Sequence, residues 1–157
     1  MEKKTINIPY EEYASIAELP DADRALLEAA IDATKGSYAP YSHFNVGAAV
    51  RLADGTVVKG ANQENAAFPS GLCAERTAMF AASANYPGVA FESLAVVCSR
   101  DGKLMPNPGS PCGACRQVMA QYEREADKPM RILLGSSGPI LAFDGVESLM
   151  PLIFNDL

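Results

Sequence analysis

The chain has 157 residues, of which 48% are hydrophobic, and a formal net charge of −6. This length fits one domain, 1–157, with a substantial core, and the acidic balance argues against a nucleic-acid polymer as partner, because such partners require a basic surface. No apolar run is long enough to cross a membrane and residues 1–5 do not resemble the start of a signal peptide, so we expect a cytoplasmic protein.

The first part of the chain alternates between helical and strand-like patterns. Within residues 1–20, Ile6, Ile8 and Tyr10 alternate with polar residues and could form a short edge strand. Small and apolar residues recur at helical spacing over 21–35. The strand-like runs 44–52 and 56–61 follow, and Ala53-Asp54-Gly55 between them is typical of a hairpin turn.

The second part continues this alternation. Residues 73–85 are alanine-rich and predict a helix, and Ser110-Pro111 predicts the start of another, with Ser110 as its cap and Pro111 in its first position. The expected elements are a helix over 73–85, a strand over 91–99, a helix from Pro111 to about Glu125, strands over 130–135 and 139–143, and a short helix over 146–150. This pattern predicts an α/β fold in which helices cover both faces of a mixed sheet.

Two cysteines, Cys112 and Cys115, stand three residues apart at the predicted start of a helix. This spacing places both sulfurs on one side of the helix, where they can bind one metal ion, and it suits zinc. A C-x-x-C pair alone fits a redox dithiol or two core cysteines about as well. Cys73, at the start of another predicted helix, supplies a third thiol. Three protein ligands leave one position of a tetrahedral zinc open, which is typical of a catalytic site.

Glu75 and Arg76 follow this third cysteine closely. A carboxylate two residues from a ligand can take a proton from metal-bound water, although an acidic residue in a first turn can also serve only the helix dipole. Three thiolates on one divalent zinc leave a net negative charge, which makes bound water harder to ionise. An arginine that donates to the sulfurs withdraws part of that charge, and we predict this role for Arg76.

The remaining cysteine and the single histidine have simpler interpretations. Cys98 lies in an apolar run without a partner nearby in the sequence, so we expect a packed core thiol. His43 as a fourth ligand would leave no room for water on the metal, so we place it at the surface or around the ligands.

The motif formed by Cys73-Ala74-Glu75 and Pro111-Cys112-Gly113-Ala114-Cys115 resembles the three-cysteine form of the zinc nucleobase deaminase signature. The wider sequence from about Tyr38 to Gln117 resembles the small cytidine deaminases, and a weaker similarity follows near the C-terminus. The matching stretches are Tyr38 to Ser42, Phe44, Val46 to Ala49, Asn62 to Ala66 and Cys112 to Gln117.

The resemblance implies a three-layer α-β-α sandwich with a mixed five-stranded sheet. It also implies a Zn²⁺-dependent enzyme of pyrimidine salvage that hydrolyses cytidine or deoxycytidine to uridine or deoxyuridine and ammonia. In this reaction Glu75 takes a proton from water and passes protons to ring atom N3 and to the exocyclic amine. The family's enzymes are homotetramers, so we expect the same assembly here, with a small nucleoside as substrate.

The same resemblance assigns residues to the substrate. Asn62 and Glu64 match the ribose-binding pair, although each could be a solvated loop residue, and Phe44 is either core or, as the family favours, a wall of the base pocket. The backbone N–H of Ala74 matches the group that fixes the base carbonyl. Phe154 matches a phenylalanine that reaches a neighbouring subunit's pocket, and the alternative is that it packs on its own core.

Three other functions stay open. The chain could deaminate another small cytosine-containing compound or a modified nucleoside, edit a nucleic acid, or serve as a zinc-stabilised binding module without activity. The acidic charge and the ribose-type pair disfavour editing, and Glu75 beside an open zinc position disfavours the inactive module. One departure from the family is Phe68, which stands where many members have tyrosine, so any hydrogen bond of that hydroxyl is absent.

Overall fold

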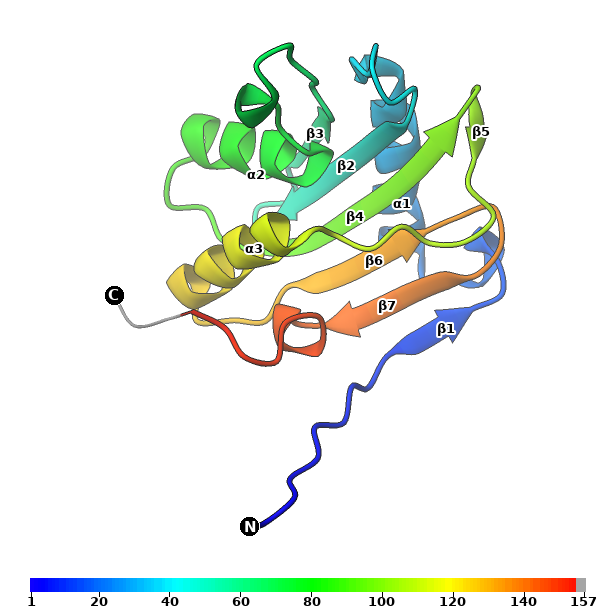
Figure 1. Cartoon of the computed structure of the whole chain (residues 1–157). Helices are drawn as coiled ribbons and strands as arrows, with labels where there is room; N and C mark the ends of the chain where they lie inside the picture. Colours follow the sequence, from blue (N-terminus) through cyan, green and yellow to red (C-terminus); the bar gives the residue numbers. More distant parts are fainter. Residues whose placement is uncertain (155–157) are drawn as a thin grey trace.

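The structure is a computed structural model that describes residues 1–154, and its elements alternate as the sequence predicts (Figure 1). Residues 155–157 of the predicted domain lie outside the described part. None of the described helices has the length and hydrophobicity that crossing a bilayer requires. The elements in chain order are β1 (Glu11–Tyr13), η1 (Ile16–Glu18), α1 (Asp21–Ala33), η2 (Thr34–Gly36), β2 (Asn45–Leu52), β3 (Val57–Ala61), η3 (Phe68–Ser70), α2 (Ala74–Asn85), β4 (Phe91–Arg100), β5 (Lys103–Leu104), α3 (Gly113–Ala126), β6 (Arg131–Gly135), β7 (Ile140–Asp144) and η4 (Val146–Ser148).

The strands form one sheet in the order β1-β7-β6-β4-β2-β3, and β5 pairs with β4. The β4–β6 pair is parallel and the other pairs are antiparallel. The predicted mixed sheet is therefore confirmed. The expected number of five strands is wrong, because the described chain adds two short strands, β1 and β5, to the five that the sequence patterns predict.

Each additional strand has an identifiable cause. Arg131 on β6 donates from Nη2 to Glu11 of β1 at 2.7 Å and from Nε to the buried Asp23 of α1 at 2.7 Å, and this fork ties β1 to the sheet edge. The edge strand therefore lies after the alternating residues 6–10, not on them. β5 exists because Asp101 and Gly102 both adopt positive φ, 51° and 73°, which closes a tight two-residue hairpin onto β4.

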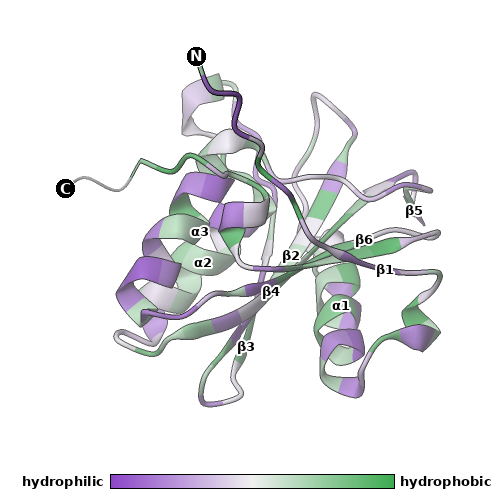
Figure 2. Ribbon diagram, turned by 90° about the horizontal axis from the view of Figure 1, so that it is seen from below, coloured by the Kyte–Doolittle hydropathy of each residue, from purple (hydrophilic) through white to green (hydrophobic). Residues whose placement is uncertain are grey.

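Helices cover both faces of the sheet, which gives the expected three layers (Figure 2). On one face, α2 and α3 pack against the sheet around Met79, Met119 and Val96. On the other face, α1 packs through Leu26 and Leu27. The two faces thus have separate cores with the sheet between them.

Glycines let the helices approach the sheet closely. A Cβ atom on Gly60 of β3 would lie 2.3 Å from the backbone N of Ala78 in α2, and one on Gly47 of β2 would lie 2.1 Å from the backbone O of Ala30 in α1. Neither position can take a side chain without moving a helix backbone. Gly60 thereby sets how closely α2, which begins beside Cys73, lies on the sheet.

The topology brings the starts of α2 and α3 together. β3 and β4 are each antiparallel to β2, so they run in the same direction, and β6 is parallel to β4. α2 connects β3 to β4, and α3 follows the short β4–β5 hairpin and leads to β6. Each helix therefore begins beyond the carboxyl end of a strand at the same edge of the sheet, where open α/β sheets place their ligands.

Candidate active site

The three predicted thiol ligands meet at this edge. Cys73 and Cys112 are the N-cap residues of α2 and α3 and share an extended conformation, with φ/ψ of −70°/155° and −68°/164°. Cys115 lies in the first turn of α3 and is buried. Their sulfurs are 3.7 Å apart between Cys73 and Cys112 and 3.4 Å apart between Cys112 and Cys115.

These distances fit zinc. Zn–S bonds of about 2.3 Å at tetrahedral angles place sulfur atoms about 3.8 Å apart. All three sulfurs lie within 4.8 Å of one another, and within residues 1–154 they form the one cluster of three or more potential metal ligands of the His, Cys, Asp and Glu types. The donor set is therefore that of a zinc site with three protein ligands.

The start of α3 differs from the prediction. The helix begins at Gly113 with Cys112 as its N-cap, whereas the sequence predicted Ser110 as the cap and Pro111 in the first position. The reason is that both residues are engaged elsewhere: Ser110 Oγ and the Pro111 carbonyl accept hydrogen bonds from the Arg116 guanidinium at 2.7 and 2.8 Å. Cys112 thus stays extended at the helix end, where its sulfur faces Cys73.

The sulfurs lie in a positive environment. Arg76 donates from Nη2 to Cys73 Sγ at 3.7 Å, and both N-cap positions place sulfur near a helix N-terminus. The hydrogen bond from Cys115, followed by those from Arg76 and Cys112, lowers the pKa of the Cys73 thiol to about 5. The hydrogen bond to Cys73 and burial raise the pKa of Cys115.

Glu75 is a buried carboxyl group beside these sulfurs. The residue is only 4% exposed, yet its side chain lines the cavity at the metal site. Burial raises the pKa of this carboxyl, and the negative charge of Cys73 raises it further. Burial of the carboxyl favours its protonated form, and a proton shuttle must pass through that form as it accepts and returns a proton.

A cavity of about 400 Å³ opens beside Glu75. Seven of the ten residues predicted for the site line it. Ala74 and Cys115 are buried behind it and do not line it, and Phe154 does not line it either. The lining comprises Tyr41, Phe44, Val46, Asn62, Gln63, Glu64, Asn65, Phe68, Gly71, Leu72, Cys73, Glu75, Arg76, Val96, Cys98, Gly109, Ser110 and Cys112.

Asn62 and Glu64 are bonded within the cavity wall. Asn62 Oδ1 accepts from the Val46 N–H at 2.8 Å, and its Nδ2 donates to the Phe44 carbonyl at 2.9 Å. Glu64 accepts from the Tyr41 N–H at 2.9 Å and from the N–H and hydroxyl of the next residue. These donors lower the pKa of Glu64, so it presents an ionised acceptor at the cavity.

Aromatic side chains form part of the wall. Phe44 lines the cavity, and the Arg100 guanidinium lies 5.6 Å from the centre of its ring, a cation–π contact. Phe68 is 77% exposed and meets Tyr41 edge-on, with ring centres 5.9 Å apart. The hydroxyl that a tyrosine would carry at this position is absent, and the phenyl ring lines the cavity mouth instead.

Cys98 faces the cavity, which the sequence interpretation missed. It is buried, as expected of a core thiol, but it also lines the cavity, and a Cβ on Gly109 would lie only 2.4 Å from its sulfur. The alternation of side chains along β4 could have shown this, because Cys98 lies two residues after Val96 and therefore on the same face of the sheet. His43 is exposed and does not line the cavity.

The described residues after β7, 145–154, form the C-terminal segment, which runs along α3. Gln117 donates from Nε2 to the Phe154 carbonyl at 3.0 Å, while the Phe154 residue is 66% exposed. Its ring therefore does not fill the core of its own chain.

The metal site makes a direct prediction. The purified protein is expected to hold one zinc per chain, and Cys73→Ala, Cys112→Ala or Cys115→Ala to lose it, because each removes one of three ligands. Cys98→Ala is the matched control and should keep the metal. Elemental analysis of the folded variants, with folding checked by circular dichroism, decides this; zinc lost only in Cys98→Ala would contradict the ligand assignment.

Comparison with known proteins agrees with this geometry. The model of the cytidine and deoxycytidylate deaminase zinc-binding region matches residues 20–127. The chain is 48% identical over 96 residues to the cytidine deaminase of Halalkalibacterium halodurans, covering 61% of this chain and 68% of that protein. It is 40% identical over 117 residues to the cytidine deaminase of Mycobacterium tuberculosis, covering 72% and 84%.

Solved structures give the same answer. The crystal structure of cytidine deaminase from Burkholderia pseudomallei superposes with a TM-score of 0.69 at 40% identity, covering 83% of this chain and 97% of that one. That of cytidine deaminase from Mycobacterium tuberculosis superposes with a TM-score of 0.65 at 32% identity, covering 87% and 99%. The chain belongs to the cytidine and deoxycytidylate deaminase family.

Proposed function

We propose that this protein is a zinc-dependent hydrolase that converts cytidine or deoxycytidine to uridine or deoxyuridine and ammonia, as a cytoplasmic enzyme of pyrimidine salvage built from one deaminase domain. The observation that supports this proposal is that the buried carboxyl of Glu75 lines a cavity of about 400 Å³ beside a cluster of three zinc-type thiols, two of which, Cys73 and Cys112, line the same cavity. The names of the relatives support the same substrate. A deaminase of another small cytosine-containing compound is the alternative, and relative turnover of cytidine, deoxycytidine and free cytosine separates the two.

The catalytic step follows from the placement of Glu75. Cys73, Cys112 and Cys115 would hold the zinc, which would act as a Lewis acid and make a water molecule easier to deprotonate. Glu75 accepts a proton from the attacking water and gives a proton to N3 of the ring as the oxygen bonds to C4. Glu75 then takes the second proton, from the hydroxyl now on C4, and transfers it to the exocyclic amine; the C4–N bond breaks as the C4 carbonyl forms, and ammonia leaves a uracil ring.

Charge at the site supports this chemistry. Three thiolates outweigh the charge of one divalent zinc, and Arg76, donating to Cys73 at 3.7 Å, withdraws electron density from a ligand. Burial of Glu75 keeps its pKa raised, so the protonated form needed to donate to N3 is accessible. The N–H of Ala74 lies at the start of α2, and we assign it to the base carbonyl.

We assign the sugar to the polar part of the cavity wall, which Asn62 and Glu64 form. Asn62 uses one amide hydrogen on Phe44 and keeps a second, and Glu64 retains acceptor capacity beyond its bonds to the residues 41–42 loop. Together they can donate to and accept from ribose hydroxyls, while Phe44, held through its carbonyl by Asn62, forms the wall beside the base. The shared bonds make the two polar residues both sugar ligands and supports of the wall.

The first prediction for this function separates binding from chemistry. Glu75→Gln is expected to keep its zinc and to bind cytidine, but to lose about two to four orders of magnitude in turnover, the usual effect of a positioned acid–base group. Elemental analysis, equilibrium binding and a spectrophotometric assay with cytidine measure the three quantities. Glu125→Gln, an exposed carboxylate on α3, is the matched control; near-normal turnover in Glu75→Gln would remove Glu75 from the mechanism.

A second prediction concerns the ribose. Glu64→Ala is expected to raise the Michaelis constant for cytidine about 10- to 100-fold, the effect of losing a hydrogen bond to a charged group. The increase should be much smaller with 3′-deoxycytidine, which lacks the partner hydroxyl. Ser42→Ala, which removes the hydroxyl bond to Glu64 and the acceptor of the Phe44 N–H but keeps the carboxylate and its backbone bonds to the loop, is the control. Equal losses on both substrates would show that Glu64 supports the loop and does not bind the sugar.

The third prediction concerns assembly as a homotetramer with shared sites. The exposed ring of Phe154 supports this proposal, because its own chain leaves it uncovered. Phe154→Ala and Glu75→Gln chains, each poorly active, should regain activity when unfolded and refolded together, since mixed oligomers contain pockets with both groups intact. Size analysis verifies mixing. Mixed oligomers whose activity equals the sum of their parts would show that Phe154 acts within its own chain.

A further inference from the structure

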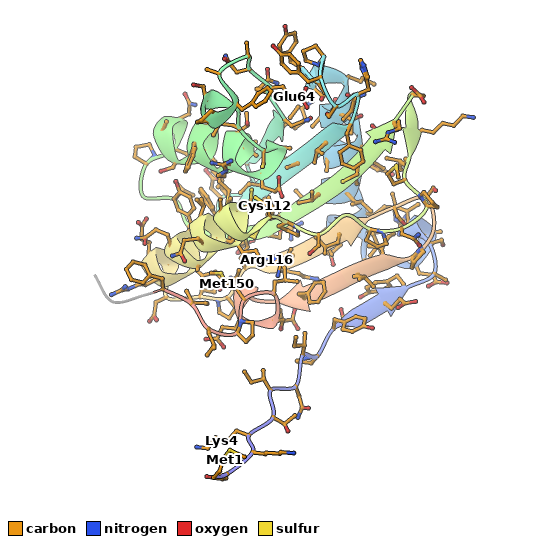
Figure 3. The ribbon with its side chains drawn as sticks, in the orientation of Figure 1. Met1, Lys4, Glu64, Cys112, Arg116 and Met150 are labelled. Atoms are coloured by element: carbon orange, nitrogen blue, oxygen red, sulfur yellow. The ribbon has the colours of Figure 1, made fainter. Side chains whose placement is uncertain are left out.

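The side chain of Arg116 supports the loop that leads to Cys112, although Arg116 lies outside the site. Arg116, in the first turn of α3 directly after Cys115, donates from Nε to the Pro111 carbonyl at 2.8 Å and from Nη2 to Ser110 Oγ at 2.7 Å. From Nη1 it donates to the carbonyl of Leu149, in the C-terminal segment. In Figure 3, Arg116 lies between Cys112 at the start of α3 and Met150 beyond Leu149.

The loop that delivers Cys112 needs such a brace. Residues 105–112 contain no helix or strand, and three of them are prolines, which have no N–H to donate. In the described chain, the hydrogen bonds that Ser110 and Pro111 accept both come from the Arg116 side chain. Cys112 itself is exposed, whereas Cys115 is buried in the α3 packing. Of the two α3 ligands, Cys112 is therefore the one whose position depends on the loop.

Only arginine suits this task. The three acceptors belong to two segments more than thirty residues apart in sequence and lie in different directions around one planar guanidinium. A guanidinium offers five N–H donors in a fixed fork, whereas a lysine ammonium is a single point charge on a flexible stem and cannot span the same acceptors. The role also differs from that of Arg76, which donates to a sulfur directly.

We propose that Arg116 is a positioning residue for the metal: it fixes Ser110 and Pro111 against Leu149 and thereby holds Cys112 Sγ within reach of Cys73 and Cys115. The inference rests on the three-cysteine zinc site and is independent of which substrate the cavity takes. Because one guanidinium bonds to both segments, the C-terminal segment contributes to how tightly the metal is held. Arg116 does not line the cavity and acts through Cys112.

The test is zinc affinity, measured on the zinc-loaded full chain by competition with a chromophoric chelator. Arg116→Lys is expected to bind zinc about 10- to 100-fold more weakly than the wild type, the range for partners that orient a metal ligand. Ser110→Ala, which deletes one acceptor at the surface, should weaken binding severalfold in the same direction, and it keeps the test decisive where Arg116→Lys fails to fold.

Two controls separate positioning from other effects. Arg131→Lys disrupts a comparable arginine fork at the β1 edge and should leave zinc affinity unchanged. Gln117→Ala releases a second side-chain bond to the C-terminal segment and should also keep the metal. Wild-type affinity in Arg116→Lys and Ser110→Ala, or an equal loss in Arg131→Lys or Gln117→Ala, would overturn the inference. A wild-type protein that binds no zinc would instead overturn the three-cysteine site itself.

Discussion

Cys73 and Cys112 can share one metal ion because β3 and β4 run in the same direction. Each strand leads through a loop into a helix on the same face of the sheet, so both helices begin at one edge with their N-termini side by side. The positive ends of two helix dipoles then converge on the place where thiolates gather. Because α2 packs closely over Gly60, the distance between the start of this helix and the sheet is fixed. The sheet topology therefore decides where the site lies before any side chain of the site is considered.

Hydrogen bonds within the cavity wall hold it in place more than the metal site does. Asn62 bonds to the backbone at both Phe44 and Val46, and Glu64 bonds to the neighbouring loop at Tyr41. These contacts link the end of β3 to the loop before β2. These polar side chains both hold the wall and line the cavity, so the same residues contribute to the shape and the polarity of the pocket.

The sequence predicted the elements that have a strong periodicity or a defined chemistry. The strands around Val96 and the helices after Cys73 and Pro111 follow from apolar patterns and a metal spacing that few other arrangements satisfy. The sequence could not predict β1, because that strand depends on an Arg131 fork that joins residues more than one hundred positions apart. It placed the start of α3 two residues early, because Ser110 resembles a helix cap but serves as an acceptor for Arg116. A prediction from neighbouring residues fails where another side chain bonds to the group on which the prediction depends.

The two sulfurs at the helix ends have a consequence for the protein without its metal. The neighbouring thiols and Arg76 lower the pKa of Cys73, whose sulfur lies 3.7 Å from that of the exposed Cys112. A thiolate next to an accessible thiol is the arrangement in which an oxidant produces a sulfenic acid that a second cysteine captures as a disulfide. Such a bond would consume two of the three ligands. A bound zinc ion engages the same electron pairs, so the metal that equips the site for hydrolysis also protects it from oxidation.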